Sequence, residues 1–207
     1  MRAYGFVDWS GDSGFEFALG SSLYLALAIG SSAHYDDLQA ALMALRGRLG
    51  LPRSFEFHWA RNAEVVRAAF FKVLSRSSWD GAVLLVDKRE LPAEFARLRE
   101  PVFYGASLRH LLTCVPLSVV GVKRLLMDGE KKDEALVRAM RLAMSSALRA
   151  RGVERLPALR AEPAHQWDGL QLADMLAGAA LERETGGRDY LREQATRLLI
   201  YKYQVVK

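Results

Sequence analysis

The chain has 207 residues, enough for one α/β domain to bury a sizeable core. Hydrophobic residues make up 51% of it and charged residues 26%, with no low-complexity stretch or Pro/Gly/Ser-rich linker, which argues against extensive disorder and predicts one domain over residues 1–207. The net charge of +5 favours polyanionic partners such as nucleic acid, although many basic proteins bind none.

Membrane insertion and disulfide chemistry are not expected. The longest apolar run, residues 23–29, is too short to cross a bilayer, and residues 1–4 lack the apolar stretch of a signal peptide. We therefore expect a soluble cytoplasmic protein. Cys114 is the only cysteine, so an intramolecular disulfide is excluded, and its position after Leu111 and Leu112 predicts a buried, inert thiol rather than a nucleophile.

The N-terminal segments predict an antiparallel meander followed by a helix. Three apolar segments, separated by turns that contain Gly and Ser, have the pattern of antiparallel strands: residues 3–8, 15–19 and 23–29. Apolar residues at helical spacing predict a helix over 34–49, which Gly50 and Pro52 end. A short extended segment, residues 55–59, comes next.

The rest of the chain alternates helices with strands. We expect, in chain order, a helix from Asn62 to residue 74, a strand over 81–86, helical segments over 92–98 and 104–114, a strand over 123–127, a helix over 132–151 that ends at Gly152, a short strand over 154–160, and helices over 169–184 and 189–201. The continuous Val/Leu run at 81–86 is typical of a buried parallel strand. A meander followed by this alternation predicts a mixed sheet with helices on its faces.

Two aspartates follow apolar strands directly. Asp8 ends the first predicted strand before a glycine-containing turn, which places it at the carboxyl edge of the sheet, where open α/β sheets bind ligands; the alternative is a turn-forming Asp, a role that suits Asp12 better. Asp128 has the same setting before Gly129. It is equally suited to capping a helix that starts near residue 130.

Asp174 lies in a helix that is apolar on nearly every side, so its side chain is expected to be buried. An ionised carboxylate there costs several kcal/mol unless a cation is close. The sequence leaves two candidates for that cation, a basic side chain in a buried ion pair or a metal ion.

For other polar residues the sequence gives weaker evidence of a functional role. Glu56 and His58 alternate on the extended segment and should point to one side, where either could join the acidic cluster. Asp168 has the position of a helix N-cap, with Gln171 completing a capping box. His165 is either an exposed loop residue or a proton shuttle beside a site.

Several known site types are excluded because their spacing rules are absent: the P-loop, GxGxxG, HExxH, paired CxxC and the GxSxG elbow. Three segments instead resemble a bacterial and phage domain-of-unknown-function family with a ribonuclease-H-like fold: residues 6–12 (FVDWSGD), 56–58 (EFH) and above all 170–178 (LQLADMLAG). Members of that family typically open with Asp-Glu-Ser-Gly-Asp and end with Leu-Gln-Leu-Ala-Asp. Trp9 stands where the family usually has Glu.

The resemblance implies a ribonuclease-H-like α/β fold and a site formed by Asp8, Glu56, Asp128 and Asp174. Such clusters in the wider superfamily bind two Mg²⁺ or Mn²⁺ ions. Carboxylate oxygens suit these hard cations, which can activate water and stabilise the leaving oxygen of a phosphodiester. The hypothesis is therefore a metal-dependent nuclease acting on DNA or RNA.

Two basic or titratable features would assist that nuclease. His165 would help to release product by proton transfer, and Lys131 or Lys132 would offset phosphate charge, although exposed lysines at a helix start need no such role. If the Glu that Trp9 replaces takes part in metal binding or substrate contact, the alternative is a catalytically altered or inactive protein of the same fold that binds nucleic acid or a partner.

Overall fold

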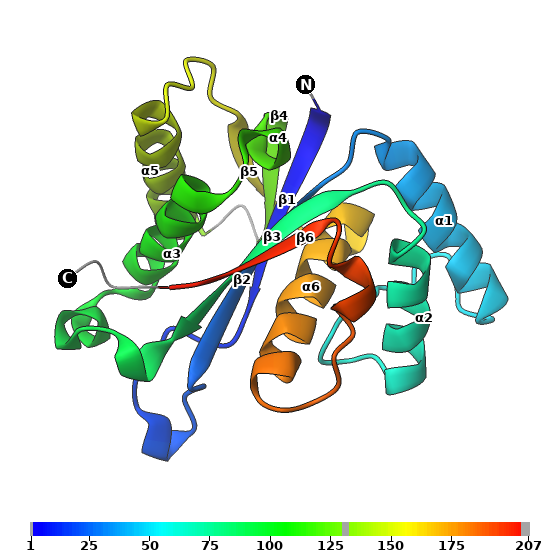
Figure 1. Ribbon diagram of the computed structural model, residues 1–207, viewed down its shortest axis with the longest axis horizontal. Coiled ribbons are helices and arrows are strands. Elements are labelled where there is room, and N and C mark those ends of the chain that lie inside the picture. Colours follow the sequence, from blue (N-terminus) through cyan, green and yellow to red (C-terminus); the bar gives the residue numbers. More distant parts are fainter. Residues whose placement is uncertain (1, 130–132, 204–207) are drawn as a thin grey trace.

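The computed structural model describes residues 2–129 and 133–203, which form a six-stranded sheet between two layers of helices (Figure 1). The strands are β1 (Arg2–Ser10), β2 (Tyr24–Ser31), β3 (Asp80–Asp87), β4 (Val122–Asp128), β5 (Ala158–Glu162) and β6 (Leu198–Lys202). Their order across the sheet is β5-β4-β1-β2-β3-β6. The pairs β1–β2 and β2–β3 are antiparallel, whereas β4, β5 and β6 add parallel strands at the two sides.

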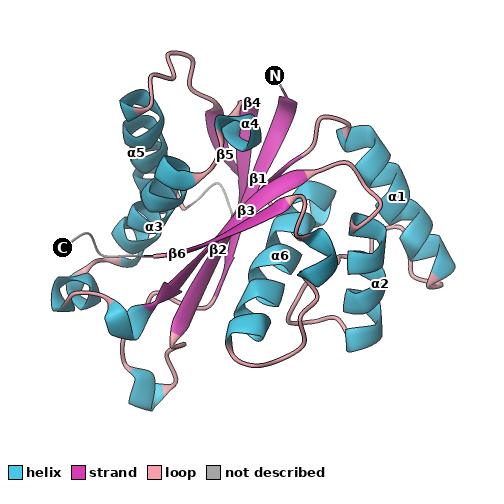
Figure 2. Cartoon of the chain, in the orientation of Figure 1, coloured by secondary structure: helices cyan, strands magenta, loops and turns pink. Residues whose placement is uncertain are grey.

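Helices cover both faces of the sheet, as Figure 2 shows. They are α1 (Tyr35–Arg48), α2 (Glu64–Leu74), α3 (Glu100–Cys114), α4 (Leu117–Val120), α5 (Glu134–Ala150) and α6 (Asp168–Glu184). One core lies between the sheet and α1, α2 and α6, and the other lies between the sheet and α3 and α5. The predicted α/β architecture, a mixed sheet flanked by helices, is confirmed.

Side-chain alternation explains why α6 lies so close to the sheet. On β2 the large residues Leu25, Leu27 and Ile29 face the α3 and α5 core, and the small Ala26 and Ala28 face α6. Gly169, in the first turn of α6, lies directly on the ring of Phe6, where an added Cβ would overlap the ring. This close approach brings the middle of α6 beside the carboxyl end of β1.

One strand prediction is wrong, and another holds only in part. Residues 15–19 form no strand, because Phe17–Leu19 is a single 3-10 turn; the antiparallel meander consists of β1, β2 and β3 instead. The run at 81–86, expected to be parallel, is β3, which is antiparallel to β2 and parallel to β6. A continuous apolar run indicates burial on both faces, but it carries no information on strand direction.

The C-terminal prediction of a helix over 189–201 is also wrong. Only Arg192–Gln194 forms a 3-10 turn, and the following residues form β6 at the edge of β3. Cys114 is exposed rather than buried, because it is the last residue of α3 and Leu111 and Leu112 occupy the core.

Other element boundaries differ by a few residues. The segment 92–98 is a 3-10 helix (Ala93–Arg97), α3 begins four residues before the predicted start, and the predicted strand at 154–160 lies at Ala158–Glu162. Gly152 adopts a positive φ of 76° just after α5, as expected for a residue that ends a helix. Among the described residues, none of the helices has the length and apolar character needed to span a membrane.

Candidate functional site

A cavity of about 590 Å³ opens at the carboxyl ends of β1 and β4, beside the middle of α6. It is lined by the four carboxylates and the histidine that were predicted to form the catalytic site: Asp8, Glu56, Asp128, His165 and Asp174. The fold therefore brings together side chains from five separate parts of the chain. Lys131 and Lys132 lie outside the described residues.

Asp8 is the most deeply buried of the four carboxylates, with 7% of its surface exposed. Burial raises the pKa of Asp8 well above its usual value, and the negative charges of Asp174 and Asp128 raise it further, against the opposing effect of a hydrogen bond from the Trp9 N–H. That bond, from Trp9 N to Asp8 Oδ1, is 2.8 Å long. Asp8 is thus close enough to the other carboxylates to feel their charge.

Asp128 is the last residue of β4, and its Oδ1 accepts a hydrogen bond of 2.9 Å from the backbone N–H of Ala164. This bond ties the end of β4 to the 3-10 turn that carries His165. The alternative role, capping a helix that starts near residue 130, falls on residues 130–132, which lie outside the described residues; the next described helix begins at Glu134. Burial raises the pKa of Asp128, although hydrogen bonds from Ala164 and Gly129 oppose the shift.

Asp174 occupies the middle of α6, and its side chain is 15% exposed. Its Oδ2 accepts a hydrogen bond of 2.6 Å from the N–H of Trp59 and lies 3.8 Å from Nδ1 of His58. Burial raises the pKa of Asp174. Within the described ranges no Lys or Arg forms an ion pair with Asp174, so the alternative of a structural ion pair gains no support.

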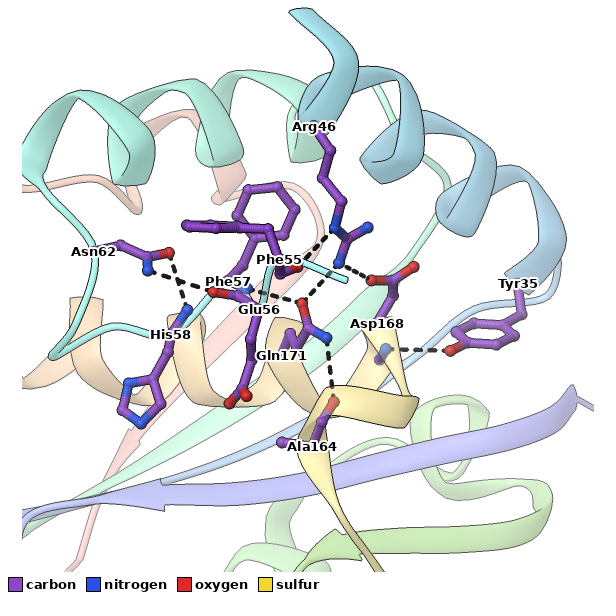
Figure 3. Close-up of polar contacts among 11 residues, drawn as sticks. Tyr35, Arg46, Phe55, Glu56, Phe57, His58, Asn62, Ala164, Asp168 and Gln171 are labelled. Carbon is purple, nitrogen blue, oxygen red and sulfur yellow. Dashed lines mark hydrogen bonds and ion pairs between the residues drawn. The ribbon is translucent and has the colours of Figure 1, made fainter. Parts of the chain in front are cut away.

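Glu56 and His58 belong to an irregular extended segment between α1 and α2. Figure 3 shows both side chains pointing from this segment toward β1, as their alternation predicted. The segment is anchored by Trp59, whose ring lies directly on Gly178 of α6, where an added Cβ would overlap it. The guanidinium of Arg67 covers the same ring at 4.4 Å from its centroid.

Asp168 and Gln171 do not form the predicted capping box. Asp168 is the first residue of α6, and its Oδ1 accepts a bond of 2.5 Å from Nη2 of Arg46 (Figure 3). Gln171 bonds to Phe57 and Ala164 instead of to the helix end. Sequence reasoning missed Arg46 altogether. Its burial could have been inferred from the sequence, because Arg46 lies one helical turn after Leu42 and therefore on the same, buried side of α1.

Comparison with known proteins identifies the fold. No family model and no curated protein matches the sequence. Similar solved structures include one from the PCNA:RNase HII complex of Archaeoglobus fulgidus (TM-score 0.59, 13% identity, 89% of this chain and 75% of that chain) and the ribonuclease H2 of Pyrococcus horikoshii OT3 (TM-score 0.56, 14% identity, 90% and 74%). The chain has a ribonuclease-H-like fold. This confirms the predicted fold class, and at such low identity the likeness establishes the fold alone.

Within this ribonuclease-H-like fold, Trp9 points to the sheet face opposite Phe6 and packs with Val7 against the α3 and α5 core. Its ring stacks on Tyr104 of α3, with centroids 4.6 Å apart and planes 29° apart. Trp9 also borders the cavity. An aromatic ring, and no carboxylate, therefore follows Asp8 at this edge of the sheet.

The donor set suits a hard divalent cation. Four carboxylates face one cavity, and among the described residues none of the four pairs with a Lys or Arg, so no Lys or Arg offsets their negative charge. No group of three or more His, Cys, Asp or Glu side chains in these residue ranges is close enough to hold an ion as it stands. Like charges repel, so we expect the carboxylates to draw together only when a cation lies between them.

Proposed function

We propose that this chain is a divalent-metal-dependent nuclease that hydrolyses phosphodiester bonds in DNA or RNA. Asp8, Glu56, Asp128 and Asp174 would hold two Mg²⁺ or Mn²⁺ ions. The observation that carries the proposal is the concentration of four carboxylates on one cavity without a Lys or Arg partner among the described residues. The two similar solved structures, one a ribonuclease H2 and the other from a complex with RNase HII, support it at the level of the fold.

The proposed ions would supply Lewis-acid activation of water and stabilisation of the leaving oxygen. The protein's own residues have simpler tasks. Asp8, Asp128 and Asp174 are each oriented by a backbone N–H, from Trp9, Ala164 and Trp59 respectively. His165 is exposed on the cavity lining, where its ring can give a proton to the departing oxygen.

The test is cleavage of single- and double-stranded DNA and RNA by purified protein in the presence of Mn²⁺. Asp8→Ala and Asp174→Ala should each abolish the metal-dependent activity. Asp37→Ala, which removes an exposed carboxylate from the first turn of α1, should leave it unchanged. Equal residual cleavage by all three variants would trace the activity to a contaminant and refute the proposal.

A catalytically altered or inactive protein of the same fold, which binds nucleic acid or a partner, is the second candidate. Trp9 favours it, because the family that the sequence resembles usually has a Glu there. A calorimetric titration with Mn²⁺ separates the two candidates. Saturable binding supports the nuclease, whereas no heat of binding at millimolar Mn²⁺ supports the binding protein.

A further inference from the structure

A buried polar network lies behind the segment that carries Glu56 (Figure 3). Its centre is Gln171 on α6, which is only 2% exposed. Buried side-chain amides are stable only where their donors and acceptors are satisfied, so each bond that Gln171 makes constrains its partner.

Gln171 connects two parts of the cavity wall that are far apart in sequence. Its Oε1 accepts a hydrogen bond of 2.9 Å from the N–H of Phe57, the residue between Glu56 and His58. Its Nε2 donates a bond of 3.1 Å to the carbonyl of Ala164, the residue before His165. One side chain therefore fixes the distance between these two backbone segments.

The hydrogen bonds of Gln171 extend through Ala164 to Asp128. The peptide N–H of Ala164 donates to Asp128 Oδ1 at 2.9 Å. A chain of hydrogen bonds thus runs from Asp128 through Ala164 and Gln171 to the backbone beside Glu56. Asp174, three residues after Gln171 on α6, accepts a bond from the N–H of Trp59. Residues of α6 therefore hold alternate residues of the segment, Phe57 and Trp59, while Glu56 and His58 line the cavity.

Arg46 fixes which way the Gln171 amide points. Its Nη2 donates to Gln171 Oε1 at 3.0 Å and to Asp168 Oδ1 at 2.5 Å, and its Nε donates to the carbonyl of Phe55 at 2.7 Å. Oε1 thus receives donors from both Arg46 and Phe57. A flipped amide would turn its NH₂ toward two donors, so a single orientation is stable.

We infer that Gln171, held by Arg46, is a positioning residue that sets the separation of Glu56 from Asp128 and thereby the affinity of the cavity for divalent metal. The inference rests on the proposed function, because it concerns the same carboxylates. It assigns Gln171 no contact with substrate or metal. Its expected signature is a change in metal affinity in a protein that remains folded.

The first experiment compares Gln171→Met with Gln194→Met by calorimetric titration with Mn²⁺. Gln194 is matched in burial, being 1% exposed, and also donates to a backbone carbonyl, that of Phe71 at 3.1 Å, but it does not line the cavity. Gln171→Met should weaken Mn²⁺ binding by about 10–100-fold, the usual cost of losing a residue that orients metal ligands. Gln194→Met should bind as the wild type does.

Hydrogen exchange at the amides of Phe57 and Trp59 gives a second readout. Mn²⁺ should slow exchange at these amides in the wild type and in Gln194→Met, and much less in Gln171→Met. Gln171→Glu guards against misfolding, because it keeps an acceptor for Phe57 and for the positively charged Arg46, while it replaces the donor to Ala164 with a carboxylate oxygen that can only accept. It should retain protection at Phe57 with an intermediate affinity.

The outcomes separate the two claims. A wild-type protein that does not bind Mn²⁺ refutes the proposed function and this inference with it. A wild type that binds Mn²⁺, together with unchanged affinity in Gln171→Met and Gln171→Glu, overturns the inference alone. An equal loss of affinity in Gln194→Met also overturns it, because the effect would then reflect general destabilisation.

Discussion

At the scale of a single residue, Asp8 shows how a carboxylate placed to bind a cation can lower the stability of the fold. Its carboxyl group is buried, and Asp174 and Asp128 add nearby negative charge. A carboxylate in that setting must either take up a proton or remain charged at a cost in folding free energy. A residue selected for stability alone would not carry a charge here.

Asp8→Asn is therefore expected to stabilise the metal-free protein while it removes metal binding. The amide oxygen can still accept the bond from Trp9, and the buried charge is gone. We expect a gain of roughly 0.5–2 kcal/mol in the free energy of unfolding. Denaturant unfolding in EDTA measures it, and a variant less stable than the wild type would contradict the prediction.

The sequence made some site residues visible because they are chemically out of place. Asp8 and Asp128 follow apolar strands directly, and Asp174 interrupts an apolar helix. Glu56 emerged mainly from the family resemblance. Arg46 was not predicted, because the helical spacing after Leu42 indicates only which side of α1 it lies on, and its bonds to Phe55 and Asp168 depend on how α1 packs against α6.

At the scale of elements, α6 organises the site because residues on one of its sides hold the segment that carries Glu56. Gln171, Asp174 and Gly178 are spaced by three and four residues, so they share one side of the helix. Two of them hold backbone N–H groups of the segment that carries Glu56, and Gly178 receives the ring of Trp59. The segment's position thus depends on α6 at three points.

Gly178→Ala should displace the Trp59 ring and loosen the bond from Trp59 to Asp174. We expect a destabilisation of about 1–3 kcal/mol, the usual cost of overpacking, together with weaker Mn²⁺ binding. The matched control is Gly47→Ala in α1, where the added Cβ meets nothing within 4 Å. Since Ala is the better helix former, that control should stabilise by about 0.4–1 kcal/mol, and thermal melts of both variants would show the opposite signs.

Elements were predicted well where their own periodicity decides their structure and poorly where a partner decides it. The apolar spacing of α5 and α6 was sufficient to place both helices. Residues 198–202 form a strand because they pair with the edge of β3. The sequence of these residues alone does not indicate that this edge is available. The direction of β3 relative to its neighbours was likewise not predictable from its own residues, because it depends on which strands lie beside it in the folded sheet.

At the scale of the whole molecule, the clustered carboxylates should make stability depend on pH and metal. Burial, and to a smaller extent the charges of acidic neighbours, raise the pKa values of Asp8, Asp128 and Asp174 in the folded state. The folded state then keeps protons that the unfolded state has released. These groups therefore contribute less stability as the pH rises from about 4 through their folded-state pKa values.

Mn²⁺ should accordingly raise the melting temperature more at about pH 7 than at about pH 5, because protonated carboxyl groups do not bind metal. Thermal unfolding in EDTA and in excess Mn²⁺ at both pH values measures the difference. The double variant Asp8→Asn/Asp174→Asn should show no Mn²⁺ shift at either pH. An equal Mn²⁺ shift at both pH values in the wild type would contradict the expected linkage.

The four carboxylates also have a consequence for how the protein matures. Asp8 comes from β1, Glu56 from the segment before α2, Asp128 from β4 and Asp174 from α6. Loops of very different length must close before these groups meet, so a cation cannot nucleate the early steps of folding. A nascent chain that has not yet released α6 from the ribosome lacks one wall of the cavity, so the proposed ions would bind only after α6 has packed on the sheet.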